Sequence, residues 1–334
     1  FNDASQHIVV VSEMGFLELI AVAFLLYYLI NILLWVLLDC NVELWFKERF
    51  GQPIASLRGQ VVWITGASSG IGSALAINLA RHGVRLVLSA RREQQLEDVR
   101  AECLKQSGGL LSPKDVLVLP MDMLDLNTHQ ARFDQVLQQF GTLDILVNNA
   151  GRSQRASWEE INVQVDRELF ELDVFAVMHL SRIVVRYYMQ QKGGCGHLAV
   201  TSSVAGILPV PFSATYCAAK HALGAYIATL KIEQPTIDVT NFAPGPIVTN
   251  FLQEAFTAQP DKKVGTTTQN DSNRMTAERC GHLFATALAN KSLLVWCGKF
   301  PVVLLTYLTQ YPAVGNILLK KMGKKIIMKI REGK

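Results

Sequence analysis

The sequence predicts an α/β protein in which a doubly wound parallel sheet follows an N-terminal transmembrane helix and precedes an apolar and basic C-terminal tail. Short runs of β-branched residues and leucine alternate with longer segments of helical periodicity, a pattern typical of parallel strands with helices on both faces. The chain has 334 residues. The part that remains after the first ~45 residues suits one large domain. We therefore expect an N-terminal segment at 1–45, a domain at 46–299 and a tail at 300–334.

The N-terminal apolar run is long enough to cross a membrane. Residues 19–38 are 20 positions without a charge, and a helix of that length spans about 30 Å, the thickness of a bilayer core. A cleaved signal peptide would have a shorter apolar stretch preceded by positive charge, whereas acidic residues precede this one, namely Asp3, Glu13 and Glu18. We expect a retained anchor at about residues 16–38.

The sequence leaves open the side of the membrane on which the domain lies. Basic residues follow the anchor and none precedes it, which by the positive-inside rule favours the cytoplasm. The glycosylation sequons at Asn270 and Asn290 are usable only on the luminal side.

Composition excludes two classes of function. The net charge is +4 and the basic residues are not interleaved with aromatic ones, so we expect no nucleic-acid partner. The six cysteines show no C-x-x-C spacing and no histidine at ligand spacing, so neither a metal nor a redox motif is expected.

Six runs are typical of strands, at residues 61–65, 84–89, 116–119, 143–147, 197–201 and 237–242. A helix at 275–290 and a strand at 292–296 are expected to follow them. Ligands of such sheets lie beyond the carboxyl ends of the strands. Residues 47–58 form a short polar connector, and residues 253–274 form a long polar segment that we expect to be a mobile flap over the substrate.

A glycine-rich motif, TGASSGIG, stands at residues 65–72 between the first strand and a helical segment. Glycine permits a tight turn, and the new helix directs its free N–H groups and its positive dipole end toward a phosphate. This context indicates a pyrophosphate-binding turn of a dinucleotide site rather than an ordinary βα turn. The residues expected to bind the cofactor here are Thr65, Gly66, Ser68, Ser69, Gly70, Ile71 and Gly72.

The end of the second strand indicates which dinucleotide would bind. An acidic residue at this place would hydrogen-bond the ribose 2′-hydroxyl of NAD, but the sequence has Ala90 followed by Arg91 and Arg92. Arg91 can pair with a 2′-phosphate, so NADP(H) is the expected cofactor. The alternative is a solvated charge pair at the start of the next helix.

Other strand ends supply further expected cofactor contacts. Asp122 is suited to hydrogen-bond the adenine amino group, and Met123 to pack nearby. Small, amide and hydroxyl-bearing residues after the fourth and sixth strands complete the set, namely Asn149, Ala150, Gly151, Pro244, Gly245, Ile247 and Thr249.

The candidate catalytic residues are Ser203 at the end of the fifth strand and, 13 residues later, Tyr216 with Lys220 on a predicted helix. Residues four apart on a helix share one face. A free tyrosine has a pKa of about 10, and an adjacent ammonium lowers it by favouring the phenolate. Ser203 can then hydrogen-bond a substrate oxygen while Tyr216 gives or takes its proton. Tyr188 and Lys192 repeat the Tyr-x-x-x-Lys spacing, but without a serine 13 residues upstream.

These motifs, taken in order, resemble the short-chain dehydrogenase/reductase family over residues 58–298: TGASSGIG, NNAG at 148–151, Ser203, YCAAK at 216–220 and PGPIVT at 244–249. The resemblance implies a single-domain Rossmann fold, no metal, a homodimer or tetramer, and contact of Tyr216 and Lys220 with the cofactor. The anchor, the SARR strand end, YCAAKHAL and the KMGKK tail are most similar to members anchored in the endoplasmic reticulum membrane. Those members resemble enzymes of that membrane that act on steroids, retinoids and other lipophilic carbonyls. The resemblance, together with the one N-terminal anchor, implies a single-pass protein of the endoplasmic reticulum membrane.

One position departs from the family pattern. The family has an asparagine where this chain has Asp173, and there the backbone carbonyl helps to hold a water of the proton relay. Aspartate retains the carbonyl but places a charge near Lys220.

The C-terminal tail combines an apolar stretch with a basic cluster. Pro301, Pro312 and Gly315 interrupt residues 300–319, so the stretch is too short to span a membrane. Seven Lys or Arg follow between 320 and 334 with the single acid Glu332. The tail can lie on an anionic membrane surface, or it can form a subunit contact followed by a solvated end.

Two functions follow from these patterns. The first is an NADP(H)-dependent oxidoreductase that interconverts carbonyl and alcohol groups of steroid, retinoid or quinone-like substrates. The second, suggested by Asp173, is a membrane-tethered NADP(H)-binding scaffold with little or no catalysis.

Overall fold

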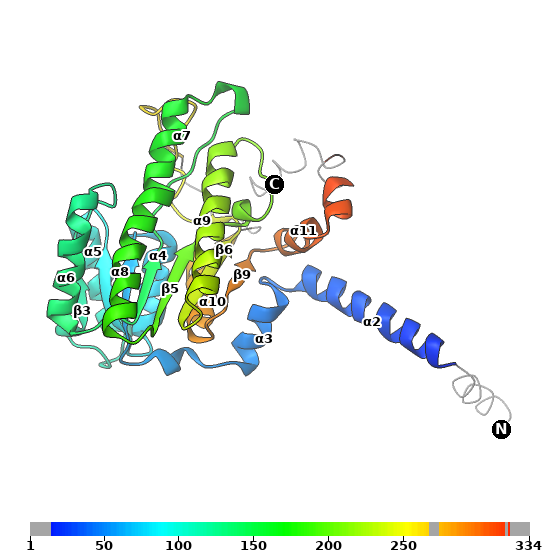
Figure 1. Cartoon of the computed structure of the whole chain (residues 1–334), viewed down its shortest axis with the longest axis horizontal. Coiled ribbons are helices and arrows are strands. Elements are labelled where there is room, and N and C mark those ends of the chain that lie inside the picture. The colour runs from blue at the N-terminus through cyan, green and yellow to red at the C-terminus, as the bar shows by residue number, and fades with distance from the viewer. Residues whose placement is uncertain (1–14, 267–273, 318–319, 321–334) are drawn as a thin grey trace.

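The computed structural model describes residues 15–266, 274–317 and 320. A seven-stranded sheet forms its centre, with all neighbouring strands parallel (Figure 1). Its order is β3-β2-β1-β4-β5-β6-β9, so the direction of winding reverses between β1 and β4. The strands are β1 (Val61–Thr65), β2 (Arg85–Ser89), β3 (Val116–Val118), β4 (Ile145–Asn148), β5 (Gly196–Thr201), β6 (Ile237–Pro244) and β9 (Leu294–Cys297).

Helices cover both faces of the sheet. One hydrophobic core joins the sheet to α4 (Gly70–Ala80), α5 (Glu93–Gln106) and α10 (Ala277–Ala289). The other joins it to α6 (His129–Phe140), α8 (Val177–Gln191) and α9 (Ala214–Glu233). Within β1, Val62 and Ile64 belong to the first core while Val61 and Trp63 belong to the second. Burial on both faces explains the continuous apolar runs, and the predicted doubly wound sheet is confirmed.

The expected helix at 275–290 begins two residues later than predicted. Met275 and Thr276 form a short strand, β8, that pairs in parallel with β7 (Ile247–Val248). The Thr276 hydroxyl then accepts the backbone N–H of Arg279 at 3.2 Å and caps α10. The pairing places the turn after β6 against the start of α10, beside the carboxyl edge of the sheet.

A π-helical turn interrupts the long helix that follows β4. The helix begins as α7 (Val163–Phe170), passes through the π turn η5 (Glu171–Ala176) and continues as α8. Such turns occur often at functional sites. Asp173 lies within this turn and is fully buried. The shorter helices are η1 (Ile54–Leu57), η2 (Pro113–Asp115), η3 (Leu126–Thr128), η4 (Trp158–Glu160) and η6 (Val204–Gly206).

The N-terminal helix α2 (Phe16–Leu37) projects away from the body (Figure 1). Among the described residues it is the one helix long and apolar enough to cross a membrane. Its end is joined to the sheet, because Asn41 N–H donates to the Trp296 carbonyl at 2.9 Å and the backbone of Cys40 forms an isolated antiparallel β-bridge with that of Cys297, both thiols being free. Helix α3 (Val42–Phe50) follows directly. The expected boundary at 45/46 therefore falls inside α3, which replaces part of the predicted connector.

The first part of the C-terminal tail packs on the body. Helix α11 (Val302–Thr309) buries Val302 and Val303, and its Tyr307 ring stacks on Trp35 of α2 at 4.5 Å between ring centroids. The expected boundary at 299/300 lies just before α11, although α11 packs against the domain that ends there. Most of the basic cluster, at 321–334, lies outside the described residues.

The expected flap is only partly described. Its first part is fixed to the loop after β4, since Phe256 N–H donates to the Ser153 carbonyl at 2.9 Å and Arg155 N–H donates to the Phe256 carbonyl at 2.8 Å. The Arg152 guanidinium and the Lys263 ammonium also lie over the Phe256 ring, 4.7 Å and 3.7 Å from its centroid. Residues 267–273 lie outside the described residues.

Candidate active site

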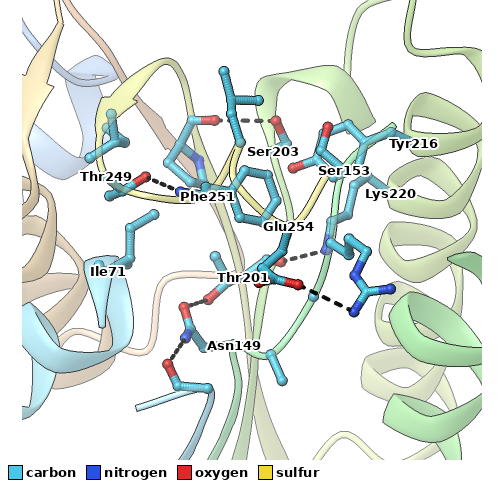
Figure 2. A pocket seen from close by; sticks show the side chains of 18 of the residues that line it. Ile71, Asn149, Ser153, Thr201, Ser203, Tyr216, Lys220, Thr249, Phe251 and Glu254 are labelled. Atoms are coloured by element: carbon cyan, nitrogen blue, oxygen red, sulfur yellow. Dashed lines mark hydrogen bonds and ion pairs between the residues drawn. The ribbon is translucent and has the colours of Figure 1, made fainter. Parts of the chain in front are cut away.

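A cavity of about 550 Å³ opens at the carboxyl edge of the sheet, where the winding reverses. Every cofactor and catalytic residue predicted above lines it, apart from Gly72 and Asp173. Gly72 lies close to Asn149, and Asp173 pairs with Lys220; both of these partners line the cavity. In Figure 2, Ile71 and Thr249 lie across the cavity from Tyr216 and Lys220.

Close approach of the β4 end explains the glycines of the turn. Gly66 has a φ of +66°, and a side-chain carbon there would lie 2.8 Å from Ala150 Cα. A carbon on Gly72 would lie 2.5 Å from Asn149 Nδ2. The Asn149 amide donates to the carbonyls of Thr65 and Gly66 at 3.0 and 3.1 Å. The NNAG segment thus holds the turn in place, while α4 begins at Gly70 with its N-terminus at the cavity.

At the far end of the cavity, the residues after β2 and β3 form a polar rim. Arg91 and Arg92 are exposed, and Arg92 Nη2 donates to Ser68 Oγ at 3.4 Å. Asp122 Oδ1 accepts the Leu124 N–H at 3.0 Å, which shapes the turn that follows β3. Ala90 occupies the strand end, so no carboxylate stands at that place.

Ser203, Tyr216 and Lys220 meet on one side of the cavity (Figure 2). The Ser203 hydroxyl accepts the Ala205 N–H at 3.1 Å and donates to the Pro244 carbonyl at 3.4 Å. Lys220 Nζ donates to the Thr201 carbonyl at 3.2 Å and lies 5.6 Å from the centroid of the Tyr216 ring. One helix turn of α9 thus brings the phenol and the ammonium together at the end of β5.

Asp173 pairs with Lys220 below the cavity. Its Oδ2 lies 3.0 Å from Lys220 Nζ, and its Oδ1 accepts the Arg152 N–H at 2.8 Å. The side chains of Asp173 and Lys220 are 0% and 5% exposed. An ion pair removed from water this completely interacts strongly, so the aspartate changes the charge that Tyr216 experiences.

Burial and charge act in opposite directions on the proton affinity of these groups. Burial raises the pKa of Tyr216, and Asp173 raises it further, while Lys220, Ser203 and Arg155 oppose the rise. The ammonium thus acts in the predicted direction, but the net pKa is above its usual value. Burial disfavours the charged form of Lys220, yet Asp173 and then Tyr216 outweigh it, and the net pKa of Lys220 is raised. Lys220 is therefore an ammonium ion.

The second Tyr-x-x-x-Lys pair lies at the opposite edge of the sheet. The Tyr188 hydroxyl donates to the carbonyls of Asp144 and His197 at 3.2 and 3.4 Å, next to the amino ends of β4 and β5. Lys192 Nζ pairs with Asp144 at 2.5 Å. This pair has a structural role, and it lies apart from the cavity.

The sequence did not single out several residues that line the cavity, including Ser153, Arg155, Leu208, Val210, Phe251, Val302 and Leu305. Their loops and helices follow strand ends without a recognisable motif. A charged residue four positions after Gly151 was the one signal that could have identified Arg155.

Comparisons with known proteins agree with this fold. The family model for short chain dehydrogenase matches residues 60–260. Dehydrogenase/reductase SDR family member 7 of Homo sapiens is 39% identical over 322 residues, which cover 95% of this chain and 94% of the human protein. A short-chain dehydrogenase structure from Streptomyces avermitilis is 28% identical, with a TM-score of 0.64 over 78% of this chain and 94% of that one. An alcohol dehydrogenase of Thermococcus sibiricus, complexed with 5-hydroxy-NADP, shares the fold at 24% identity and a TM-score of 0.61, over 72% of this chain and 97% of that one.

Proposed function

Because the chain belongs to the short-chain dehydrogenase/reductase family, we propose that it is an NADPH-dependent oxidoreductase that reduces a carbonyl group of a lipophilic substrate to an alcohol. The observation that carries this proposal is the convergence of Ser203, Tyr216 and Lys220 in the cavity that the glycine turn borders.

The residues present fit NADP(H). Gly66 and Gly70 have positive φ values and bring the backbone of the turn close to the cavity, where the α4 N-terminus favours an anion. Arg91 and Arg92 at the rim would hold a 2′-phosphate, which an acidic residue at position 90 would repel. When bound, the nicotinamide supplies a hydride to the carbonyl carbon.

The protein residues would orient the substrate and supply the proton. Ser203 hydrogen-bonds the carbonyl oxygen, and Tyr216 donates its phenolic proton to that oxygen as the alcohol forms. Because the pKa of Tyr216 is raised, the phenol is protonated near neutral pH. A protonated tyrosine is the form that can donate a proton during reduction. Lys220, held as an ammonium ion by Asp173, stabilises the phenolate that remains.

The apolar part of the cavity supports a lipophilic substrate. Leu208, Val210, Phe251, Val302 and Leu305 line it. Val302 and Leu305 belong to α11, which packs against the anchor helix α2 through Tyr307 and Trp35. A steroid, retinoid or quinone-like carbonyl dissolved in a bilayer would therefore reach the site near the membrane surface.

The same proposal includes single-pass attachment to the endoplasmic reticulum membrane and assembly as a homodimer, both suggested by the family resemblance.

The direct test is a panel of steroids, retinals and quinones, with their alcohols, assayed with NADP(H) and with NAD(H). We expect NADPH oxidation with at least one lipophilic carbonyl. If no member of the panel turns over with either cofactor, the reductase proposal fails.

Replacing Arg91 with alanine tests the choice of cofactor. The variant loses a charge-assisted contact to the 2′-phosphate, so kcat/KM for NADPH should fall by roughly 10-fold or more while kcat/KM for NADH changes little. The measurement is the ratio of the two kcat/KM values with one carbonyl substrate. Lys105→Ala, on the outer end of α5, is the matched control for loss of a surface charge, and an unchanged ratio in Arg91→Ala would contradict the assignment.

Replacing Asp173 with asparagine distinguishes the proposed reductase function from the alternative of a cofactor-binding scaffold without catalysis. The side-chain carbonyl oxygen of the new asparagine can still accept the Arg152 N–H, but the negative charge that raises the pKa of Tyr216 is gone. The pKa of Tyr216 should fall, so the alkaline loss of reductase activity should move to lower pH and alcohol oxidation near neutral pH should become faster. Steady-state pH profiles of wild type and variant measure this shift. A scaffold predicts cofactor binding without turnover in either protein.

A further inference from the structure

Arg155 places a guanidinium in the substrate part of the cavity. It lies in the loop after β4, where its backbone N–H donates to the Phe256 carbonyl, and its Nη1 donates to Ser213 Oγ. Ser213 stands directly before α9, three residues ahead of Tyr216, and both of them line the cavity with Arg155. Arg155 is thus fixed at both ends of its side chain beside the candidate catalytic tyrosine.

The charge of Arg155 has no acidic partner in the described part of the chain. None of the ion pairs there includes it, whereas neighbouring Arg152 has Glu254 at 4.0 Å. Burial lowers the pKa of Arg155 to about 10. A half-buried guanidinium that donates to a neutral hydroxyl, with no ion pair among the described residues, gives up solvation without the compensation of a counter-ion.

Ser153 provides a second polar group on the same side of the loop. Gln154 pairs with Phe256 in an extended conformation, so the side chains of residues 153 and 155 point to the same face. Ser153 is fully buried and lines the cavity on the side of Tyr216 (Figure 2). Its hydroxyl has no hydrogen-bond partner among the described residues. Buried polar groups are normally paired, so this hydroxyl indicates a missing polar ligand.

We propose that Arg155, with Ser153, binds a carboxylate group of the substrate. The substrate would then be an amphipathic oxo acid, with its acid group near the reacting carbonyl and its apolar part directed toward Val302 and Leu305 of α11. This inference rests on the proposed reductase function and specifies its substrate class. Arginine suits the role because its planar fork matches a carboxylate.

Matched acid and amide pairs test the inference. 3-Acetylbenzoate and 3-acetylbenzamide, and likewise phenylglyoxylate and phenylglyoxylamide, have nearly the same shape and differ in charge. Titration calorimetry of each compound with the full chain in detergent, saturated with NADP⁺, measures binding without turnover. The wild type should bind the acid of at least one pair about 10- to 100-fold more tightly than the amide, and kcat/KM with NADPH should follow the same order.

Two variants locate the source of this preference. In Arg155→Gln the preference for the acid should fall to about two-fold or less, and Arg155→Lys should retain part of it. Arg152→Gln is the matched control, since it removes a guanidinium from the same cavity and should leave the preference unchanged.

Three results would overturn the inference: equal binding of acid and amide by the wild type in both pairs, an Arg155→Gln variant that weakens both compounds equally, or an equal loss of preference in Arg152→Gln. Because the contrast within the wild type is measured by binding, it stands even if a variant fails to fold. Failure of the reductase proposal would look different, as NADP⁺ and the acid would bind without any carbonyl turnover.

Discussion

Replacing Tyr216 with phenylalanine is expected to lower kcat for carbonyl reduction by roughly 10²- to 10⁴-fold, the usual contribution of a general acid. Phenylalanine keeps the ring that fills the cavity wall and removes the one proton that Tyr216 would donate to the substrate oxygen. Binding of NADPH should change little, because the phosphate-binding turn, Arg91 and Arg92 lie at the other end of the cavity. Single-turnover oxidation of NADPH and a fluorescence titration of the cofactor measure the two effects separately.

Tyr188→Phe is the matched control, since Tyr188 shares the spacing to a lysine but lies at the opposite edge of the sheet. It should leave kcat near the wild-type value and lower the free energy of unfolding by about 1 kcal/mol, because the phenol hydrogen bond to the carbonyls of Asp144 and His197 is lost. Equal activity losses in the two variants would contradict the assignment of Tyr216.

Replacing Lys220 with methionine is expected to damage both activity and stability. The Asp173 carboxylate would remain buried without its counter-ion, which costs about 3–5 kcal/mol of the free energy of unfolding. Activity should fall together with this loss, because the phenolate of Tyr216 would no longer be stabilised. Denaturant unfolding and steady-state kinetics measure the two effects.

The double variant Lys220→Met, Asp173→Asn separates the loss of activity from the loss of stability. Removing the unpaired carboxylate should restore most of the lost stability, whereas activity should stay low because the ammonium is still absent. Recovery of activity along with stability would show that Lys220 has a structural role only, and no recovery of stability would contradict the buried ion pair.

Sequence alone predicted most of the fold. Strands such as β1 and β5 are buried on both sheet faces, so they appear in the sequence as continuous apolar runs. Such a run can be recognised locally, without knowledge of the strands beside it. The family assignment, from motifs read in order along the chain, is confirmed by the relatives. The packing of Cys40 against Cys297 and the position of α11 could not be predicted, because both join segments far apart in the sequence.

The candidate site was predictable where residue type and strand position together imply chemistry. Ser203, Tyr216 and Lys220 belong to such a pattern, and they meet at one cavity. The sequence suggested a charge near Lys220 at Asp173, but the direct ion pair depends on a π turn that packing determines. Arg155 and Ser153 are aimed into the cavity by the pairing of Gln154 with Phe256, about 100 positions away, which no local pattern reveals.

Transfer of deuterium tests the central claim most directly. The full chain would be loaded with NADPH that carries deuterium at both C4 positions of the nicotinamide and mixed with a lipophilic ketone or aldehyde, and the product analysed by mass spectrometry. We predict that the wild type places one deuterium on the new alcohol carbon in a single turnover and that Tyr216→Phe does so far more slowly while still binding NADPH. Absence of deuterated alcohol from every carbonyl tested, or transfer by Tyr216→Phe at the wild-type rate, would contradict the claim that the protein is a carbonyl reductase with Tyr216 as its acid.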